Sequence, residues 1–344
     1  MNMNEEKILE QAIKQIEIQF GKGYITKFDN NHNTIDVIPS GSIKVDKILG
    51  VGGYPKGRII EIYGNESCGK TTLALQAIAS CQSIGGKCAY IDLEHALDAK
   101  FCTANGVDLS KMLLAQPDSG EQTFQLIAAL IKTGMIDLIV VDSVAAIVPE
   151  SEIHGSFSDQ TIGLQARIMS KGLRVIQGLL AKYNTTIIFI NQLREKVGVF
   201  YGSNEITTGG RALKFYSSIR IELKRAELIK NGSECIGIRS IAKVVKNKLA
   251  PPLSKAYIDF YFDQGIDHNE EIIQYALDYD IIQKKGSWYY YNGDRLGQGK
   301  ETTAEYLLAN PTVFEDIKNK CLNRKDTCII EAEEKIKEDL KTTK

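Results

Sequence analysis

Residues 57–72 read GRIIEIYGNESCGKTT, and this stretch decides the fold. Its first half is a short β-rich apolar run, and its second half matches the pattern GxxxxGK[ST] from Gly64 to Thr71. The residues that follow carry apolar side chains at helical spacing. A strand, a glycine-rich loop and a helix in this order predict a loop whose backbone N–H groups hold phosphate at the start of a helix.

The loop predicts a role for each of its polar side chains. Lys70 would neutralise the β- and γ-phosphates of a nucleoside triphosphate, and Thr71 would hold Mg²⁺ through its hydroxyl. The alternative is a glycine-rich turn with an exposed lysine. The predicted nucleotide contacts are Gly64, Asn65, Glu66, Ser67, Cys68, Gly69, Lys70, Thr71 and Thr72.

The rest of the chain indicates the fold class. Short apolar runs, CAYIDLE, LLAQP, DLIVVDS and TTIIFINQ, alternate with helical stretches at about 120–133 and 163–183. Buried strands that alternate with helices predict an α/β fold, a mostly parallel twisted sheet with helices on both faces. Later β-rich runs at 217–224, 240–246 and 256–262 have no long helices between them, so we expect antiparallel strands at one edge.

Both ends of the chain differ from this core. Residues 5–20 have the spacing of a short amphipathic helix, and an Asn- and Gly-rich linker follows as far as about residue 56. After residue 267, short helices at 270–280, 301–309 and 312–322 surround a hairpin at Asn292-Gly293. We expect an N-terminal helix and linker at 1–33, a P-loop NTPase core at 34–267, a small α+β C-terminal domain at 268–328 and a charged tail at 329–344.

Composition excludes some classes of protein. The 344 residues contain 42 Lys and Arg against 43 Asp and Glu, a net charge of −1, so any nucleic-acid surface must be a local patch. The seven cysteines are an odd number without a CxxC pair, which disfavours zinc and a disulfide framework. No signal peptide and no long apolar stretch is evident, so we expect a cytoplasmic protein without a membrane segment.

Carboxylates follow two of the predicted strands. Asp142 ends the run LIVVD, and Glu94 lies just past CAYID. In a phosphate-loop protein these strand ends share one sheet edge, where Asp142 would bind the metal and Glu94 would polarise an attacking water. Taken alone, Asp142 could merely cap a turn, and Glu94 could be an ordinary surface acid.

Two further segments are candidates for binding. The run TTIIFI ends in Asn191-Gln192, where an amide could sense a γ-phosphate, and a long stretch follows up to residue 208. Its cationic and apolar side chains suit a groove for single-stranded nucleic acid, although an ordinary lid is the alternative. Lysines also gather in KVVKNK at 243–248, which a solvated surface would equally explain.

Taken together, these motifs resemble one known family. GNESCGKTT, YIDLEHALD, LIVVDS, FINQLREKVGVFYG, TTGGRALKFY and KVVKNK occur in the order and spacing of the bacterial RecA recombinases, and the likeness covers nearly the full chain. The resemblance implies a RecA-like core and a filament on single-stranded DNA that hydrolyses ATP with Mg²⁺. It also implies homologous pairing with double-stranded DNA, strand exchange in DNA repair, and self-cleavage of the LexA repressor in the SOS response.

The resemblance assigns roles to particular residues. It implies that Glu94 is the catalytic glutamate, Asp142 the Mg²⁺-linked aspartate and Gln192 the γ-phosphate sensor. Asp98 and Phe101 occupy the positions that face adenine.

Other residues match positions at the subunit interface and at the DNA. Lys246 and Lys248 match lysines that reach the ATP of a neighbouring subunit, and Phe215 matches an interface aromatic near that ATP. The DNA-binding loops correspond to about 155–162 and 193–208. The DNA contacts implied by the resemblance are Ile162, Arg167, Arg174, Arg194, Lys196, Val197, Val199, Gly209 and Gly210.

The chain departs from the family pattern at several places. Asn65 and Cys68 replace the usual Pro and Ser, and Cys68 is expected to add an oxidisable thiol beside the phosphates. Glu195 places an acid in the second DNA loop, and the tail carries lysines among its acids.

Two other functions are alternatives to the recombinase. One is a small-molecule P-loop kinase, which needs a substrate pocket and an arginine-bearing lid, and the other is a non-catalytic filament scaffold.

Overall fold

A computed structural model describes residues 3–21, 35–155, 163–195 and 205–323 of the chain. The chain divides into two units, residues 1–36 and residues 37–344. The described part of the first unit contains α1 (Met3–Phe20), close to the helix that the sequence predicts over 5–20. Apolar side chains of this helix, among them Ile8 and Ile18, are exposed.

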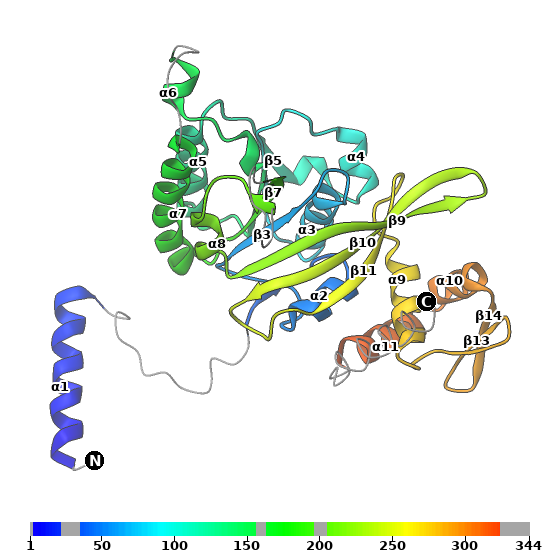
Figure 1. The fold of residues 1–344 in the computed structure, drawn as a ribbon. Helices are drawn as coiled ribbons and strands as arrows, with labels where there is room; N and C mark the ends of the chain where they lie inside the picture. Colours follow the sequence, from blue (N-terminus) through cyan, green and yellow to red (C-terminus); the bar gives the residue numbers. More distant parts are fainter. Residues whose placement is uncertain (1–2, 22–34, 156–162, 196–204, 324–344) are drawn as a thin grey trace, which may run out of the picture. The chain divides into compact units, whose positions relative to one another are not determined.

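The second unit is built on a large sheet with the strand order β11-β10-β9-β3-β7-β6-β4-β5, and β8 pairs with the end of β7. Its middle strand β3 (Ile59–Gly64) is parallel to both of its neighbours, β7 and β9. β9, β10 and β11 pair antiparallel, which confirms the predicted mostly parallel sheet with an antiparallel edge (Figure 1). The remaining bounds are β4 (Cys88–Asp92), β5 (Met112–Ala115), β6 (Leu138–Asp142), β7 (Thr186–Glu195), β8 (Glu205–Thr207), β9 (Ile219–Asn231), β10 (Glu234–Asn247) and β11 (Lys255–Tyr261). A separate short pair joins β1 (Val37–Ile38) and β2 (Tyr54–Pro55).

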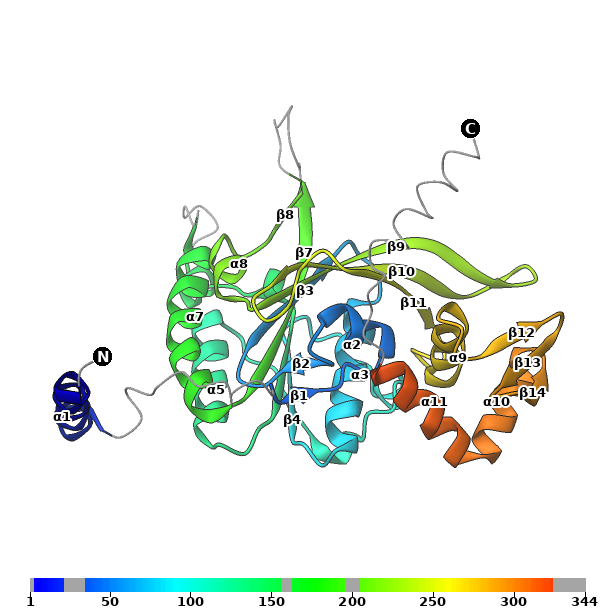
Figure 2. The same ribbon diagram turned by 90° about the horizontal axis from the view of Figure 1, so that it is seen from below.

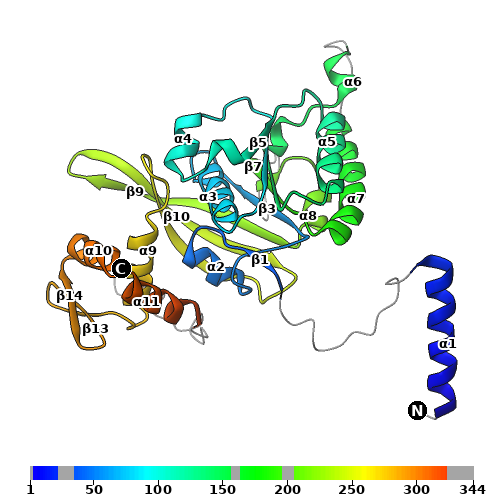
Figure 3. The same ribbon diagram turned by 180° about the vertical axis from the view of Figure 1, so that it is seen from behind.

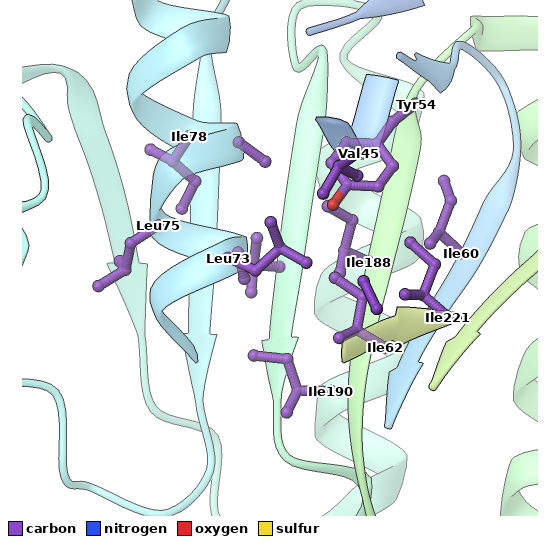
Figure 4. Close-up of a cluster of buried hydrophobic side chains, with 14 of the residues drawn as sticks. Val45, Tyr54, Ile60, Ile62, Leu73, Leu75, Ile78, Ile188, Ile190 and Ile221 are labelled. Carbon is purple, nitrogen blue, oxygen red and sulfur yellow. The ribbon is translucent and has the colours of Figure 1, made fainter. Parts of the chain in front are cut away.

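Helices cover both faces of the sheet because both faces of its central strands are apolar. Ile60 and Ile62 of β3 lie in one cluster with Leu73 and Ile78 of α3 (Figure 4). Ile59 points to the opposite face and belongs to a second cluster. The first face carries α2 (Ile43–Leu49), α3 (Lys70–Ser83) and α4 (Ala99–Ala104), and the second carries α5 (Gly120–Lys132), α7 (Leu164–Tyr183) and α8 (Ala212–Tyr216).

The long helices agree closely with the sequence predictions at 120–133 and 163–183. Ser119 caps α5 by accepting a hydrogen bond from the Gln122 N–H. Gly163 precedes α7 and Asn184 follows it. Both residues have a positive φ, a backbone conformation that does not continue an α-helix. A single turn, α6 (Glu150–Ile153), precedes α7. Within the described ranges no helix is long and apolar enough to cross a membrane.

Two elements differ from the sequence expectation. β9 and β10 are longer than the sequence predicts, and their hairpin end extends past both β3, which ends opposite Leu223, and β11, which ends opposite Gly237 (Figure 2). The mostly exposed residues of this end lack the long apolar run that indicates a buried strand. The turn residue Gly232 has a φ of 62° and follows Asn231, so Asn-Gly is the overlooked signal. α2 replaces part of the expected linker, and its seven residues are marked by caps at Ser42 and Gly50 instead of by periodicity.

The C-terminal elements gather around an apolar cluster of their own (Figure 3). Asn292 and Gly293 both have positive φ between β13 and β14, so the predicted hairpin is confirmed. The bounds are α9 (His268–Asp278), β12 (Gln283–Lys285), β13 (Trp288–Tyr291), β14 (Asp294–Gln298), α10 (Lys300–Ala309) and α11 (Pro311–Asn323). The predicted tail at 329–344 lies outside the described residues.

A buried acid joins this group to the core, and a second buried acid lies on the core side. Glu271 of α9 accepts hydrogen bonds from the Ser42 hydroxyl at 2.6 Å and from the Ile43 N–H at 2.8 Å. Asp46 of α2 accepts one from the Ser40 N–H at 2.9 Å. Burial, together with the nearby charge of Glu271, raises the pKa of Asp46 to about 7, against the hydrogen bonds from Ser40 that lower it.

We expect Asp46→Asn to stabilise the protein at alkaline pH. The unfolded carboxyl ionises near 3.8, whereas the folded one keeps its proton up to about 7. Folding therefore takes up a proton in this window, and the stability contributed by the protonated group is lost as the pH rises through it. An amide still accepts from Ser40 but never ionises. The free energy of unfolding of the variant should therefore exceed that of the parent by about 1–3 kcal/mol above pH 7, and this gain should vanish towards pH 4. Urea unfolding across this range measures the gain, and a gain independent of pH would contradict the assignment.

Candidate nucleotide and DNA site

Two glycines at the ends of the loop between β3 and α3 lie too close to neighbouring residues to carry a side chain. A Cβ atom on Gly64 would lie 2.1 Å from the Leu223 carbonyl oxygen. Gly69 has a φ of 91°, and a Cβ atom there would lie 2.5 Å from the ring of Phe260. The tight loop therefore places the first turn of α3, which begins at Lys70, directly beside the backbone of residues 65–69.

Lys70 curls back over this loop. Its Nζ donates to the carbonyl oxygens of Asn65 at 2.6 Å and Gly64 at 3.2 Å. An ammonium group at this place can equally donate to phosphate oxygens held by the loop N–H groups.

Cys68 is not the oxidisable thiol that the sequence suggests. Its side chain is 1% exposed, and its Sγ donates to the Asn65 carbonyl at 3.0 Å. Burial raises the pKa of this thiol more than the nearby Lys70 lowers it, so the reactive thiolate is disfavoured. The expectation of a reactive cysteine beside the phosphates is therefore wrong.

Asp142 lies at the end of β6, and one of its carboxylate oxygens accepts hydrogen bonds from two hydroxyl groups. Thr71 Oγ1 donates to its Oδ2 at 2.9 Å, and Tyr90 OH donates to the same atom at 2.7 Å. Burial raises the pKa of Asp142, and the Tyr90 and Thr71 hydrogen bonds oppose that rise. Tyr90 is not among the predicted site residues, and its position on β4, two residues before the strand ends, is the only signal for it in the sequence.

The oxygen atoms of Thr71 and Asp142 fit Mg²⁺. This ion prefers hard oxygen ligands and usually binds through one or two protein groups, with substrate phosphates and water completing its coordination. Among the described residues no cluster of three or more His, Cys, Asp or Glu side chains could hold a metal alone.

We expect Tyr90→Phe to lower the free energy of unfolding by about 1–3 kcal/mol. The variant keeps the buried ring but removes the hydroxyl that donates to Asp142, so a buried carboxylate loses one of its partners. Urea unfolding without nucleotide measures the change. Tyr183→Phe, at the half-buried end of α7, is the control and should change stability by less than about 0.5 kcal/mol. Equal stability of the two variants would contradict a stabilising role for the Tyr90 hydrogen bond.

Glu94 lies where three strands end at the same edge. Its Oε1 accepts hydrogen bonds from Ser143 Oγ, just after β6, and from Gln192 Nε2 of β7 at 3.3 Å. The structure thus brings Glu94, Gln192 and the Asp142 region together, as the sequence analysis expects. Sequence reasoning missed Ser143, which directly follows Asp142.

Asp92 shapes the turn that carries Glu94. Its carboxylate accepts from the N–H groups of Ala96 and Leu97 at 3.3 and 3.2 Å. The same turn leads to Asp98, which caps α4 by accepting from the Phe101 N–H at 2.8 Å. Phe101 packs partly against the apolar cluster of α3. The two predicted adenine-facing residues therefore lie together at the start of α4.

Of the three lysines of KVVKNK, Lys246 lies near the end of β10 and Lys248 directly follows the strand. Lys246 Nζ donates to the carbonyl oxygens of Lys214 at 2.7 Å and Phe215 at 3.0 Å, both in α8. Burial lowers the pKa of Lys246 to about 8, and the positive charges of Lys248 and Arg220 add to this effect. Phe215 is 67% exposed. The hydrogen bonds of Lys246 thus point it to α8, and not to the phosphate loop of its own subunit.

The predicted DNA contacts fall into three groups. Arg167 and Arg174 are exposed on α7, and Arg194 is exposed on β7. Gly209 and Gly210 both have a positive φ. A Cβ atom added to Gly209 would lie 2.8 Å from Val144 Cγ1, and one added to Gly210 would lie 2.8 Å from Ala166 Cβ. Close packing therefore explains these glycines without any DNA contact. Ile162, Lys196, Val197 and Val199 lie outside the described residues.

Comparisons with known proteins agree over almost the whole chain. Residues 7–267 match the RecA N-terminal domain and residues 270–326 match the RecA C-terminal domain. The chain is 54% identical over 317 residues to Protein RecA of Malacoplasma penetrans, covering 92% of this chain and 96% of that relative. It is 52% identical over 321 residues to Protein RecA of Staphylococcus epidermidis, covering 93% and 92%. The crystal structure of the RadB recombinase has a TM-score of 0.50 at 24% identity and covers 66% of this chain and 98% of its own, a likeness of fold alone.

Proposed function

Because the chain belongs to the RecA family, we propose that the edge carrying Lys70, Asp142 and Glu94 is where it hydrolyses ATP. The protein is a DNA-dependent ATPase and a recombinase, which binds DNA and forms filaments. The observation that supports this location most strongly is the meeting of Thr71 with Asp142, and of Glu94 with Gln192, beside the phosphate loop.

Each of these groups has its own role in the proposed reaction. The loop N–H groups and Lys70 hold the β- and γ-phosphates in place. Thr71 and Asp142 would hold Mg²⁺, which neutralises charge on the phosphates when bound. Glu94 takes a proton from the attacking water and is oriented for this by Ser143. Gln192 donates a hydrogen bond to the γ-phosphate and loses that partner once phosphate leaves.

Recombination itself is tested by strand exchange. A labelled single strand is incubated with the protein, ATP, Mg²⁺ and a duplex of the same sequence, and transfer of the label into duplex is followed. We expect transfer with the homologous duplex and none with a duplex of unrelated sequence. Equal transfer to both duplexes, or transfer to neither, would contradict the proposed activity.

The active site is proposed to be shared between neighbouring subunits. Lys246 lies near the end of β10, where it contacts the backbone of the exposed Phe215, and Lys248 directly follows the strand. Both lysines would reach the ATP bound to the next subunit. ATP would then join two subunits and stabilise the filament by contacts that only the assembled state makes.

We expect Lys246→Ala to lower DNA-dependent ATP hydrolysis by about 10²-fold, because one charge that stabilises the transition state is lost. The variant should still bind nucleotide through its own loop. Mixing it with Lys70→Ala protein should restore part of the rate, because some interfaces then combine an intact loop with an intact lysine. If mixtures show no more than the sum of the separate rates, the lysine acts within its own subunit through α8.

Two finer assignments complete the proposal. We expect the filament on single-stranded DNA to promote self-cleavage of the LexA repressor, and cleavage that does not require DNA would contradict this. From the proposed action on DNA we infer a cytoplasmic location. The boundaries 1–33, 34–267, 268–328 and 329–344 remain proposals for the domain organisation.

A further inference from the structure

The side chain of Asn191 makes four hydrogen bonds in the protein interior. Its Nδ2 donates to Glu61 Oε1 at 2.9 Å and to the Thr208 carbonyl oxygen at 3.2 Å. Its Oδ1 accepts from Thr208 Oγ1 at 2.5 Å and from the Gln192 N–H at 2.9 Å. Asn191 is fully buried, and both its donors and its acceptor are engaged, so the amide has one orientation that satisfies every partner.

Glu61 attaches this amide to the centre of the sheet. It lies on β3, is fully buried, and accepts from Arg220 Nε of β9 at 2.5 Å with its other oxygen. The Arg220 guanidinium also lies over the ring of Tyr63, 4.5 Å from its centre. A buried ion pair whose partners sit on adjacent strands resists displacement, because moving either partner leaves a buried charge unpaired. Glu61 is therefore a fixed point for Asn191.

Thr208 attaches the same amide to a long segment. Beyond Gln192, the last residues of β7 pair antiparallel with β8, and Leu193 lies opposite Thr207. The Thr208 N–H also donates to the Gln192 carbonyl at 3.4 Å. Asn191 thus lies at the point where both stems of the segment 193–208 meet the sheet. It directly precedes Gln192, whose side chain contacts Glu94.

We propose that Asn191 is a positioning residue that couples the stems of the segment 193–208 to Gln192. The proposal rests on the proposed function, in which this segment binds DNA and Gln192 senses the γ-phosphate. One atom, Asn191 Oδ1, holds both Thr208 and the Gln192 N–H, so a movement of the stems changes the support of Gln192. DNA and ATP then favour the same arrangement, and each raises the affinity for the other.

The test measures this coupling by binding alone. The dissociation constant for a labelled oligothymidylate is determined by fluorescence anisotropy, once with ADP and once with a slowly hydrolysed ATP analogue. The ratio of the two constants is the coupling factor. Thr208→Val removes only the hydroxyl that donates to Asn191, and we expect it to lower the factor about fivefold or more. Thr207→Val removes a hydroxyl one residue earlier on the same stem and should leave the factor within about twofold.

The outcomes separate positioning from general damage. If Thr208→Val weakens both dissociation constants equally, the hydroxyl serves DNA binding or folding, and the proposal is overturned. An equal loss of coupling in both variants also overturns it, since the effect then belongs to the whole stem. Thr208→Ser keeps the hydroxyl and should retain the parent factor, and Thr208→Ala repeats the deletion with a smaller side chain. A parent protein with a factor of one contradicts the proposed function instead, before any variant is compared.

Discussion

Lys70→Ala is expected to reduce ATP hydrolysis by about 10²–10³-fold, the cost of removing one charged donor that faces a transferring phosphoryl group. The substitution should not harm the fold. Lys70 donates to the carbonyl oxygens of Asn65 and Gly64 and more weakly to Cys68 Sγ, and none of these is a charged partner that would be left unpaired. Alanine also favours the first turn of α3. Phosphate release in the presence of single-stranded DNA measures the loss.

A surface lysine provides the matched control for this experiment. Lys132 is exposed at the end of α5, on the other face of the sheet, and Lys132→Ala should hydrolyse ATP at the parent rate. If Lys70→Ala also kept that rate, the loop between β3 and α3 would not be the catalytic phosphate site.

Glu94→Gln is expected to separate hydrolysis from assembly. Glutamine keeps an oxygen that can accept from Ser143 and has nearly the same shape, but it cannot take a proton from water. Hydrolysis should fall by about 10²–10⁴-fold, the usual contribution of a general base. ATP should still be bound, and filaments on single-stranded DNA should form and last longer than those of the parent.

Sedimentation of DNA-bound protein, measured together with the rate of phosphate release, distinguishes the recombinase from the non-catalytic scaffold. A scaffold that uses ATP only to lock its filament needs no base at this position. Turnover at the parent rate together with lost assembly would therefore favour the scaffold over the recombinase. Parent-like turnover with normal assembly would remove Glu94 from the mechanism altogether.

Much of the site could be predicted because it depends on local sequence. The order strand, glycine loop, helix around Gly64 to Thr71 fixes where phosphate binds. Parallel strands end at a common edge, so the runs before Glu94, Asp142 and Gln192 already imply that these residues meet. The mostly parallel sheet with its antiparallel edge and the Asn292-Gly293 hairpin follow from the same local patterns, whereas the short strand β8 does not.

The supporting residues could not be predicted because their partners lie far away in the sequence. Tyr90 reaches Asp142 and Asn191 reaches Glu61 only through the register of neighbouring strands, which no local pattern states. The burial of Cys68 likewise depends on residues of distant elements that close over the loop. The sequence predicts β9 and β10 to be shorter than they are, because their exposed end resembles a loop.

The central claim is that DNA binding and ATP hydrolysis act through one edge of the sheet. It is tested most directly by steady-state ATP hydrolysis with and without long single-stranded DNA, at one fixed salt concentration, since DNA affinity depends on salt. We expect strong stimulation by DNA in the parent protein and none in Lys70→Ala. A basal rate that DNA leaves unchanged would contradict the account, because the segment 193–208 would then not be coupled to Glu94 and Gln192.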